Sequence, residues 1–334
     1  MKLKIIWIDD LPSRKSSSKL LETKIKDKLN KKTEFNDAEV HFADVSQQDL
    51  FTLLDNIRIH GDADLILMDH LLTNVERPTV GSTAAEFLRE KMAAMPIVCV
   101  TGENLTKIGA HRSSLYDEIL AIEKVSKSAA LLISIAKSYK VLREKPPKSV
   151  GQLINLLGVP KTDRERLAMI LPDDLKLGMN RDKNNSILRM SRWVRNTLLE
   201  RPGFLYDRLW TATLLGIKEN SFHKVEAFFE GAKYSGLFCV DGRDRWWQSQ
   251  LRQILADVVS VGKNELPWEM GRRLLNISKN DYSKCNKSGK DFPETVAYLD
   301  ESLEDRAPMR LRYTVRHPLF EESLFFEEIR MMKG

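Results

Sequence analysis

The sequence of 334 residues predicts an α/β domain with a doubly wound, parallel, five-stranded sheet, followed by a mainly α-helical domain with a small β element. Short apolar runs alternate with amphipathic helical patterns over residues 1–143, which is typical of a parallel sheet with helical crossovers. Helical patterns dominate residues 144–334. Pro146 and Pro147 separate the two parts, because proline cannot continue a helix. We therefore expect two domains, residues 1–143 and residues 144–334.

The run at residues 62–69 predicts the central strand of the sheet. Leu65 to Met68 are consecutive apolar residues, too few for an independent helix but enough for a strand that is covered on both faces. The run ends on Asp69. Ligands of open α/β sheets bind at the carboxyl ends of parallel strands, so Asp69 is the first candidate site residue.

Polar residues also follow other apolar runs of this half. The acidic pair Asp9 and Asp10 closes the first run, Thr101 closes the fourth, and Lys124 follows the fifth. Because the carboxyl ends of parallel strands meet at one edge of a sheet, we expect these side chains to gather around Asp69. The predicted strands are residues 3–10, 38–43, 62–69, 96–102 and 119–122.

Amphipathic patterns predict the helices that connect these strands. Apolar side chains recur at helical spacing in each connecting segment. The many basic residues of the first helix are expected to form a solvent-exposed face. The predicted helices are residues 14–31, 47–59, 83–92 and 127–143.

The carboxylates at this edge predict a cation site. Three carboxylates that converge repel one another unless a hard divalent cation lies among them, and Mg²⁺ accepts carboxylates together with water and phosphate oxygens. A carboxylate beside such a metal can attack a phosphoryl group in line. Thr101 and Lys124 would then bind the oxygens of the acyl phosphate. The alternative is a sheet of the same kind that serves only packing or docking.

This pattern resembles the receiver domain of bacterial two-component response regulators, which have a flavodoxin-like fold. The order Asp-Asp, Asp, Thr, Lys and the placement at strand ends agree over about residues 1–143. The resemblance implies that Asp69 is the phosphoacceptor and that a sensor histidine kinase or a phosphotransfer protein is the donor. It also implies that Thr101 and Lys124 bind phosphoryl oxygens, and that Mg²⁺ is the cofactor. The implied metal ligands are Asp9, Asp10, Asp69 and the backbone carbonyl of Leu71.

The sequence departs from the receiver pattern at the fifth strand. Val125 follows Lys124 where the family usually has proline, and Ala121 occupies the position of the usual aromatic residue. Lys127 is the alternative for the site lysine. Without the aromatic residue, we expect any movement to pass through the long loop at residues 71–81.

The second half carries one clear β pattern. Residues 309–316 alternate between apolar and polar side chains, which predicts a strand. Arg310, Arg312 and Arg316 would share one face of it, where they could bind phosphates or an acidic partner. The alternative is a solvated strand face.

Composition is that of an ordinary soluble protein. Hydrophobic residues make up 42% and charged residues 30%, and no run approaches the ~18 apolar residues of a membrane span. The three cysteines are far apart and the chain enters a strand without a signal peptide, so we expect a cytoplasmic protein. The net charge of +6 comes from the second half, where 32 Lys and Arg face 26 Asp and Glu from residue 145 onward.

The output of the second half is open between two classes. A protein partner is favoured, because the charge is nearly balanced and aromatic residues are frequent. DNA binding is the alternative, since response regulators commonly control transcription and the basic excess lies here. No catalytic motif occurs in residues 144–334, so we expect no enzymatic activity beyond transfer of the phosphoryl group to Asp69.

Overall fold

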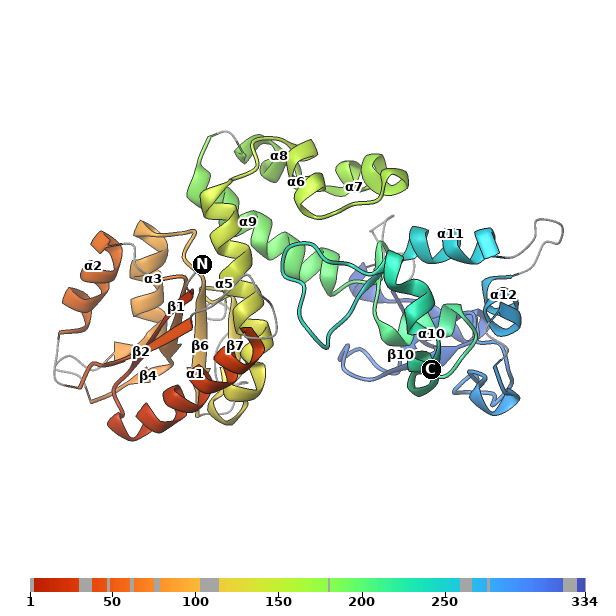
Figure 1. The fold of residues 1–334 in the computed structure, drawn as a ribbon, viewed down its shortest axis with the longest axis horizontal. Helices are drawn as coiled ribbons and strands as arrows, with labels where there is room; N and C mark the ends of the chain where they lie inside the picture. Colours follow the sequence, from red (N-terminus) through yellow and green to blue (C-terminus); the bar gives the residue numbers. More distant parts are fainter. Residues whose placement is uncertain are drawn as a thin grey trace. The chain divides into compact units, whose positions relative to one another are not determined.

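The computed structural model shows two compact units, which we describe separately (Figure 1). The first unit contains Met1–Ser149 together with Asp173–Arg192, and the second contains Val150–Pro172 and Trp193–Gly334. Asp62, at the start of the predicted central strand, lies outside the described residues. The described residues are 3–29, 38–46, 49–60, 63–74, 79–102, 114–179, 181–258, 266–274, 277–320 and 329–333.

A five-stranded parallel sheet forms the centre of the first unit, as the sequence predicts. The strand order is β2-β1-β3-β6-β7, so the direction of winding reverses between β1 and β3. At such a switch point the connections leave in opposite directions and open a crevice at the carboxyl ends of the strands. The strands are β1 (Leu3–Asp9), β2 (Ala38–Asp44), β3 (Leu65–Asp69), β6 (Ile97–Thr101) and β7 (Glu118–Ala121).

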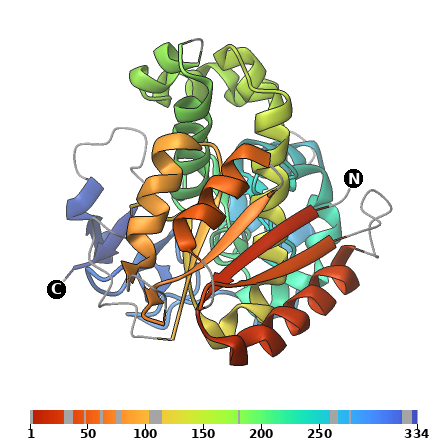
Figure 2. The ribbon, with the colours of Figure 1, turned by 90° about the vertical axis from the view of Figure 1, so that its left-hand side faces the viewer.

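Helices cover both faces of this sheet (Figures 1 and 2). α1 and α5 pack together on one face, and α2 and α3 pack together on the other. All residues of β3 are buried, and a helix from each layer, α3 and α5, packs against this strand. The helices are α1 (Lys15–Leu29), α2 (Leu50–His60), α3 (Gly81–Lys91) and α5 (Ala129–Glu144).

A short β-hairpin follows Asp69 directly, within the long loop predicted from the sequence. Its strands are β4 (Leu71–Leu72) and β5 (Thr79–Val80), which pair antiparallel. The amide of Gly81, the first residue of α3, donates a hydrogen bond to the carbonyl of His70 (2.8 Å). The chain therefore returns to the end of β3 before α3 begins.

Partly buried ion pairs hold two helices to the opposite, amino-terminal edge of the sheet. Asp64, just before β3, accepts from Lys140 (3.0 Å) and Arg143 (3.1 Å) of α5. Asp117, just before β7, pairs with Arg89 of α3 (2.6 Å). Each carboxylate has a cationic partner at its own edge, so these charges are structural.

The second unit is mainly helical and contains a small sheet. The sheet has the order β11-β10-β13-β12, and a separate two-stranded ribbon joins β8 and β9. The helices are α6 (Val150–Leu156), α7 (Arg164–Ile170), α10 (Arg208–Leu214), α11 (Gln248–Val258) and α12 (Pro267–Leu274). The strands are β8 (Leu205–Tyr206), β9 (Trp246–Trp247), β10 (Thr295–Tyr298), β11 (Arg306–Met309), β12 (Thr314–Arg316) and β13 (Arg330–Met332).

Further helical segments complete the chain. α8 (Asp173–Gly178) belongs to the first unit. α9 (Lys183–Trp193) ends at Trp193, where the chain enters the second unit, and a π-helix, Val194–Leu199, continues from it. Short 3₁₀ helices span Pro12–Arg14, Ile122–Lys124, Ser126–Ser128, Lys161–Asp163, Glu219–Lys224, Glu226–Ala232, Lys279–Asp281, Leu311–Tyr313 and Pro318–Phe320.

The single strand predicted at residues 309–316 is wrong. β11 ends at Met309, a 3₁₀ turn follows, and β12 begins at Thr314. In the turn the amide of Tyr313 donates to the carbonyl of Arg310 (2.9 Å), and the amide of Leu311 donates to the carboxylate of Glu294 (2.6 Å) instead of to a strand partner. Arg310, Arg312 and Arg316 therefore do not share one strand face.

In the described part of the chain, no helix combines the length and the apolar character that crossing a membrane requires.

Candidate functional site

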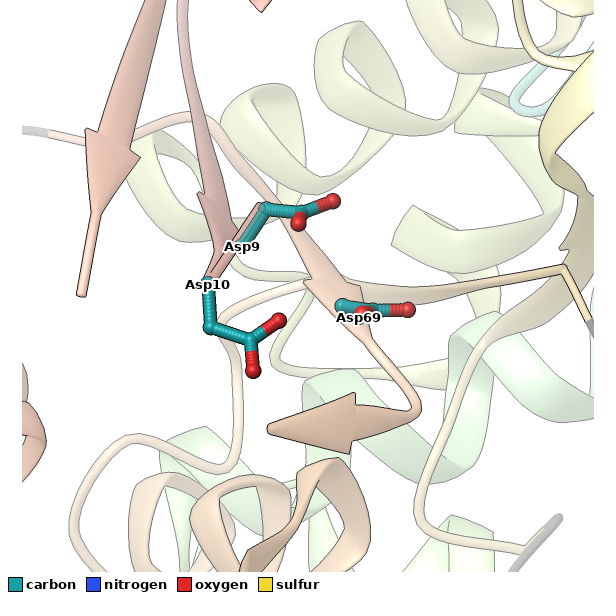
Figure 3. Close-up of side chains that lie close together, drawn as sticks. All are labelled: Asp9, Asp10 and Asp69. Atoms are coloured by element: carbon teal, nitrogen blue, oxygen red, sulfur yellow. The ribbon is translucent and has the colours of Figure 1, made fainter. Parts of the chain in front are cut away.

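Three buried carboxylates meet at the switch point of the sheet. Asp9 is the last residue of β1, Asp10 follows it, and Asp69 is the last residue of the neighbouring strand β3. Each offers a carboxylate oxygen within 4.8 Å of the others (Figure 3). The exposed fractions of these residues are only 0%, 1% and 3%. The structure thus brings together the three aspartates that the sequence predicts.

Backbone amides orient these carboxylates. Asp9 accepts from the amide of Leu11 (2.9 Å), and Asp69 accepts from the amide of His70 (2.8 Å). Asp10 accepts from the amide of Asn74 in the hairpin that follows β3 (2.6 Å). The hairpin is therefore linked to the acidic cluster by a short, charge-assisted hydrogen bond.

Arg14 is a member of the site that the sequence analysis missed. Its Nη1 atom lies 3.1 Å from Oδ2 of Asp9 and 3.1 Å from Oδ1 of Asp69. The sequence pattern places Arg14 at the start of a basic helix and predicts that the charges of this helix face solvent. Its position one turn after the Asp-Asp pair, at the helix end that faces the carboxyl edge of the sheet, was the available signal.

Burial and mutual repulsion shift the ionisation of the cluster. Burial, followed by the charge of Asp9, raises the pKa of Asp69 to about 6, although Arg14 and the His70 amide oppose this. Burial also raises the pKa of Asp9, against the Leu11 amide and Arg14. Burial lowers the pKa of Arg14, but attraction to Asp69 and Asp9 outweighs it, so the net shift is upward. The site therefore holds excess negative charge in a poorly hydrated position.

A cavity of about 290 Å³ opens at this cluster. Thr101, at the end of β6, and Leu71 line it. The same wall contains the guanidinium of Arg14. The lining residues are Asp10, Leu11, Arg14, Asp69, Leu71, Thr73, Thr101 and Gly102.

Lys124 does not belong to the described residues that line this cavity. β7 ends at Ala121, which pairs with Thr101, and the chain then enters the 3₁₀ turn that contains Lys124. The side chain of Lys124 is exposed, and so is that of the alternative, Lys127.

The donor set fits Mg²⁺. Three carboxylates within 4.8 Å offer the hard oxygen ligands that this ion prefers, and the hairpin residue Leu71 lines the same cavity. Arg14 contributes one positive charge, so the cluster of three ionised carboxylates with Arg14 retains two negative charges. A divalent cation would neutralise them.

The sheet order and the acidic cluster define an α/β module of flavodoxin-like topology with a candidate cation site at its switch point. No protein-family model and no curated protein matches the chain.

Similar solved structures include response regulator receiver proteins. The response regulator TrrA from Thermotoga maritima, in complex with Mg²⁺-BeF, is 18% identical, covers 36% of this chain and 85% of its own, and has a TM-score of 0.25. The receiver domain of a Francisella response regulator is 18% identical, with coverages of 43% and 99% and a TM-score of 0.27. A receiver protein from Sinorhizobium medicae is 16% identical, with coverages of 41% and 97% and a TM-score of 0.27. At these scores the likeness says nothing about chemistry.

Proposed function

We propose that this chain is a receiver-type signalling protein in which Asp69 accepts a phosphoryl group from a sensor histidine kinase or a phosphotransfer protein. The observation that carries the proposal is the buried cluster of Asp9, Asp10 and Asp69, which faces a cavity lined by Thr101. Residues 1–143 would be the phosphoacceptor domain, and residues 144–334 would be the output domain.

The geometry suits phosphoryl transfer to a carboxylate. An oxygen of ionised Asp69 attacks phosphorus and forms the C–O–P link of an acyl phosphate. The bond from phosphorus to the imidazole nitrogen of the donor breaks, and that nitrogen keeps the electron pair and takes up a proton. Bound Mg²⁺ would supply neutralisation of the transferred charge. Asp9, Asp10 and the carbonyl of Leu71 would hold it, and the hydroxyl of Thr101 would donate to a phosphoryl oxygen.

A protein partner is the output that we propose for the second unit. The DNA-binding alternative gains no support from the strand arginines. Arg310 lies 3.8 Å from Glu294, and Arg312 donates to the hydroxyl of Tyr313 (2.8 Å), so these two make different local contacts. DNA binding through these arginines requires that they lie on one strand face and contact successive phosphates. The described residues do not have that face.

Phosphorylation of the full chain tests the proposal. We expect acetyl phosphate with Mg²⁺ to add one phosphoryl group, detected by intact mass, and the modified peptide to contain Asp69. Asp69→Asn should remove the modification. Asp44→Asn is the matched control, because Asp44 ends β2 at the same edge of the sheet but is not part of the cluster. Unmodified wild-type protein, also with a phosphorylated histidine kinase domain as donor, would contradict the proposal.

A further inference from the structure

The cation of the candidate site comes from an unexpected element. The guanidinium of Arg14 contacts both Asp9 and Asp69, and its side chain is 20% exposed. Arg14 belongs to the turn between β1 and α1, whereas the sequence pattern predicts that Lys124, after β7, is the cation of the site. Of the described residues that line the cavity, Arg14 is the one with a cationic side chain.

The turn that carries Arg14 is locked to the acidic cluster. The amide of Arg14 donates to the carbonyl of Leu11 (2.9 Å), and the amide of Leu11 donates to Asp9 (2.9 Å). Pro12 opens the turn, where its fixed φ is compatible with a helical start. The backbone therefore holds the Arg14 side chain at the switch point before any ligand arrives.

The guanidinium also reaches toward the strand that carries Thr101. A Cβ built on Gly102 would lie 3.5 Å from Nη2 of Arg14, which places this nitrogen beside the residue that follows Thr101. The two terminal nitrogens thus extend from Asp69 toward the end of β6. A phosphoryl group on Asp69 that is also bound by Thr101 would lie between Asp69 and the end of β6, beside these nitrogens.

We propose that Arg14, and not Lys124, is the cation that binds the phosphoryl oxygens on Asp69; this inference rests on the proposed function. Before transfer, Arg14 pairs with the carboxylates of Asp9 and Asp69. Transfer replaces the carboxylate charge of Asp69 with a phosphoryl group of about two negative charges. The planar guanidinium then donates to two phosphoryl oxygens, a geometry for which arginine is better suited than lysine.

The proposal predicts opposite effects on cation binding and anion binding. Loss of the Arg14 charge removes a competitor of Mg²⁺ for Asp9 and Asp69, so the affinity for Mg²⁺ should rise. The same loss removes two donors to the phosphoryl group, so the affinity for a phosphoryl mimic should fall. A residue that only supported the fold would weaken both when it is replaced.

The experiment compares full-length wild type with Arg14→Gln and Lys124→Gln. Lys15→Gln is the matched control, because Lys15 is exposed and adjacent to Arg14. Mg²⁺ is titrated by tryptophan fluorescence, since the indole of Trp7 donates to Asp9 (3.3 Å). Beryllofluoride is then titrated by the same signal at saturating Mg²⁺.

For Arg14→Gln we expect several-fold tighter binding of Mg²⁺ and at least about tenfold weaker binding of beryllofluoride, the size of one lost charged hydrogen bond. Lys124→Gln and Lys15→Gln should change neither affinity by more than about twofold. If Arg14→Gln does not fold, Arg14→Lys replaces it. This variant keeps the positive charge but loses the planar pair of guanidinium donors, so beryllofluoride binding should still weaken.

Two results separate this inference from the proposed function. In the first result, wild type binds beryllofluoride, Lys124→Gln loses this affinity and the Arg14 variant keeps it. Arg14 is then not the phosphoryl cation, and the proposed function stands. In the second result, wild type binds Mg²⁺ and Asp10→Asn does not, but wild type does not bind beryllofluoride at saturating Mg²⁺. The proposed function then fails, and this inference fails with it.

Discussion

Gly81 lies against the backbone of Asp69 so closely that a Cβ on residue 81 would be 2.0 Å from the carbonyl oxygen of Asp69. This contact joins the first residue of α3 to the last residue of β3. The hairpin between them is thereby returned to the edge of the sheet where the carboxylates lie. A glycine is required because no side chain fits between the two backbones.

Gly81→Ala should therefore destabilise the first unit. The added methyl group would push the start of α3 away from β3, at a cost of about 1–3 kcal/mol in the free energy of unfolding. Chemical denaturation measures this change. Gly102→Ala is the control, since among the described residues its Cβ would meet Arg14 Nη2 alone, at an ordinary contact distance of 3.5 Å. Equal stabilities of the two variants would contradict the close approach.

Ionisation of Asp69 should make stability depend on pH. The pKa of Asp69 is raised to about 6 in the folded state, above the value of 3.8 expected for an unperturbed aspartate. The folded state therefore holds this proton more tightly than the unfolded state. The resulting stabilisation is complete below about pH 4 and is lost as the pH rises through about 6.

The difference in unfolding free energy between wild type and Asp69→Asn isolates this effect. Without metal, wild type should lose up to about 3 kcal/mol relative to the variant between pH 4 and pH 7. Denaturation at each pH, with a chelator present, gives the difference directly. A difference that stays constant over this range would show that Asp69 has an ordinary pKa.

Mg²⁺ should stabilise the fold through the acidic cluster. An ion that binds the folded state alone adds about 2.7 kcal/mol at a concentration 100 times its Kd. Thermal melts with increasing Mg²⁺ should therefore shift upward in wild type and in Asp44→Asn. Asp10→Asn should shift much less, because Asp10 is one of the three clustered carboxylates. An unchanged wild-type melt would remove the metal site from this protein.

A phosphoryl mimic should act on the hairpin more than on the fifth strand. The amide of Asn74 donates to Asp10 (2.6 Å), so a change in the charge of the cluster reaches the hairpin through one bond. Hydrogen exchange with beryllofluoride and Mg²⁺ should change more in residues 71–81 than in residues 119–127. Asp69→Asn should abolish this response. Identical exchange with and without the mimic would contradict this prediction and favour the alternative, a domain that serves only packing or docking.

The sheet and the acidic cluster could be predicted because local sequence carries their physical causes. Buried parallel strands need apolar side chains on both faces, as in the run from Leu65 to Met68. Parallel strands also bring their carboxyl ends to one edge. Asp9, Asp10 and Asp69 were therefore placed together by their positions at strand ends alone, and the structure agrees.

The second unit shows where a local pattern is insufficient. The alternation of apolar and polar side chains at residues 309–316 predicts a strand equally well at every position. At the break the amide of Leu311 donates a hydrogen bond to Glu294, a residue on another segment. Such a contact exists only after the chain has folded, and it leaves no trace in the alternation.

Apolar runs with polar ends were sufficient to predict the fold of the first unit and the meeting of three carboxylates at its edge. Which cationic side chain lies beside these carboxylates depends on tertiary contacts. Lys124 lies in the 3₁₀ turn after β7 and is not among the described residues that line the cavity. Arg14 reads as one basic residue among many, yet the turn before α1 directs it to Asp69 on another strand. The direction of a long side chain depends on partners that are distant in sequence, and a periodic pattern does not encode them.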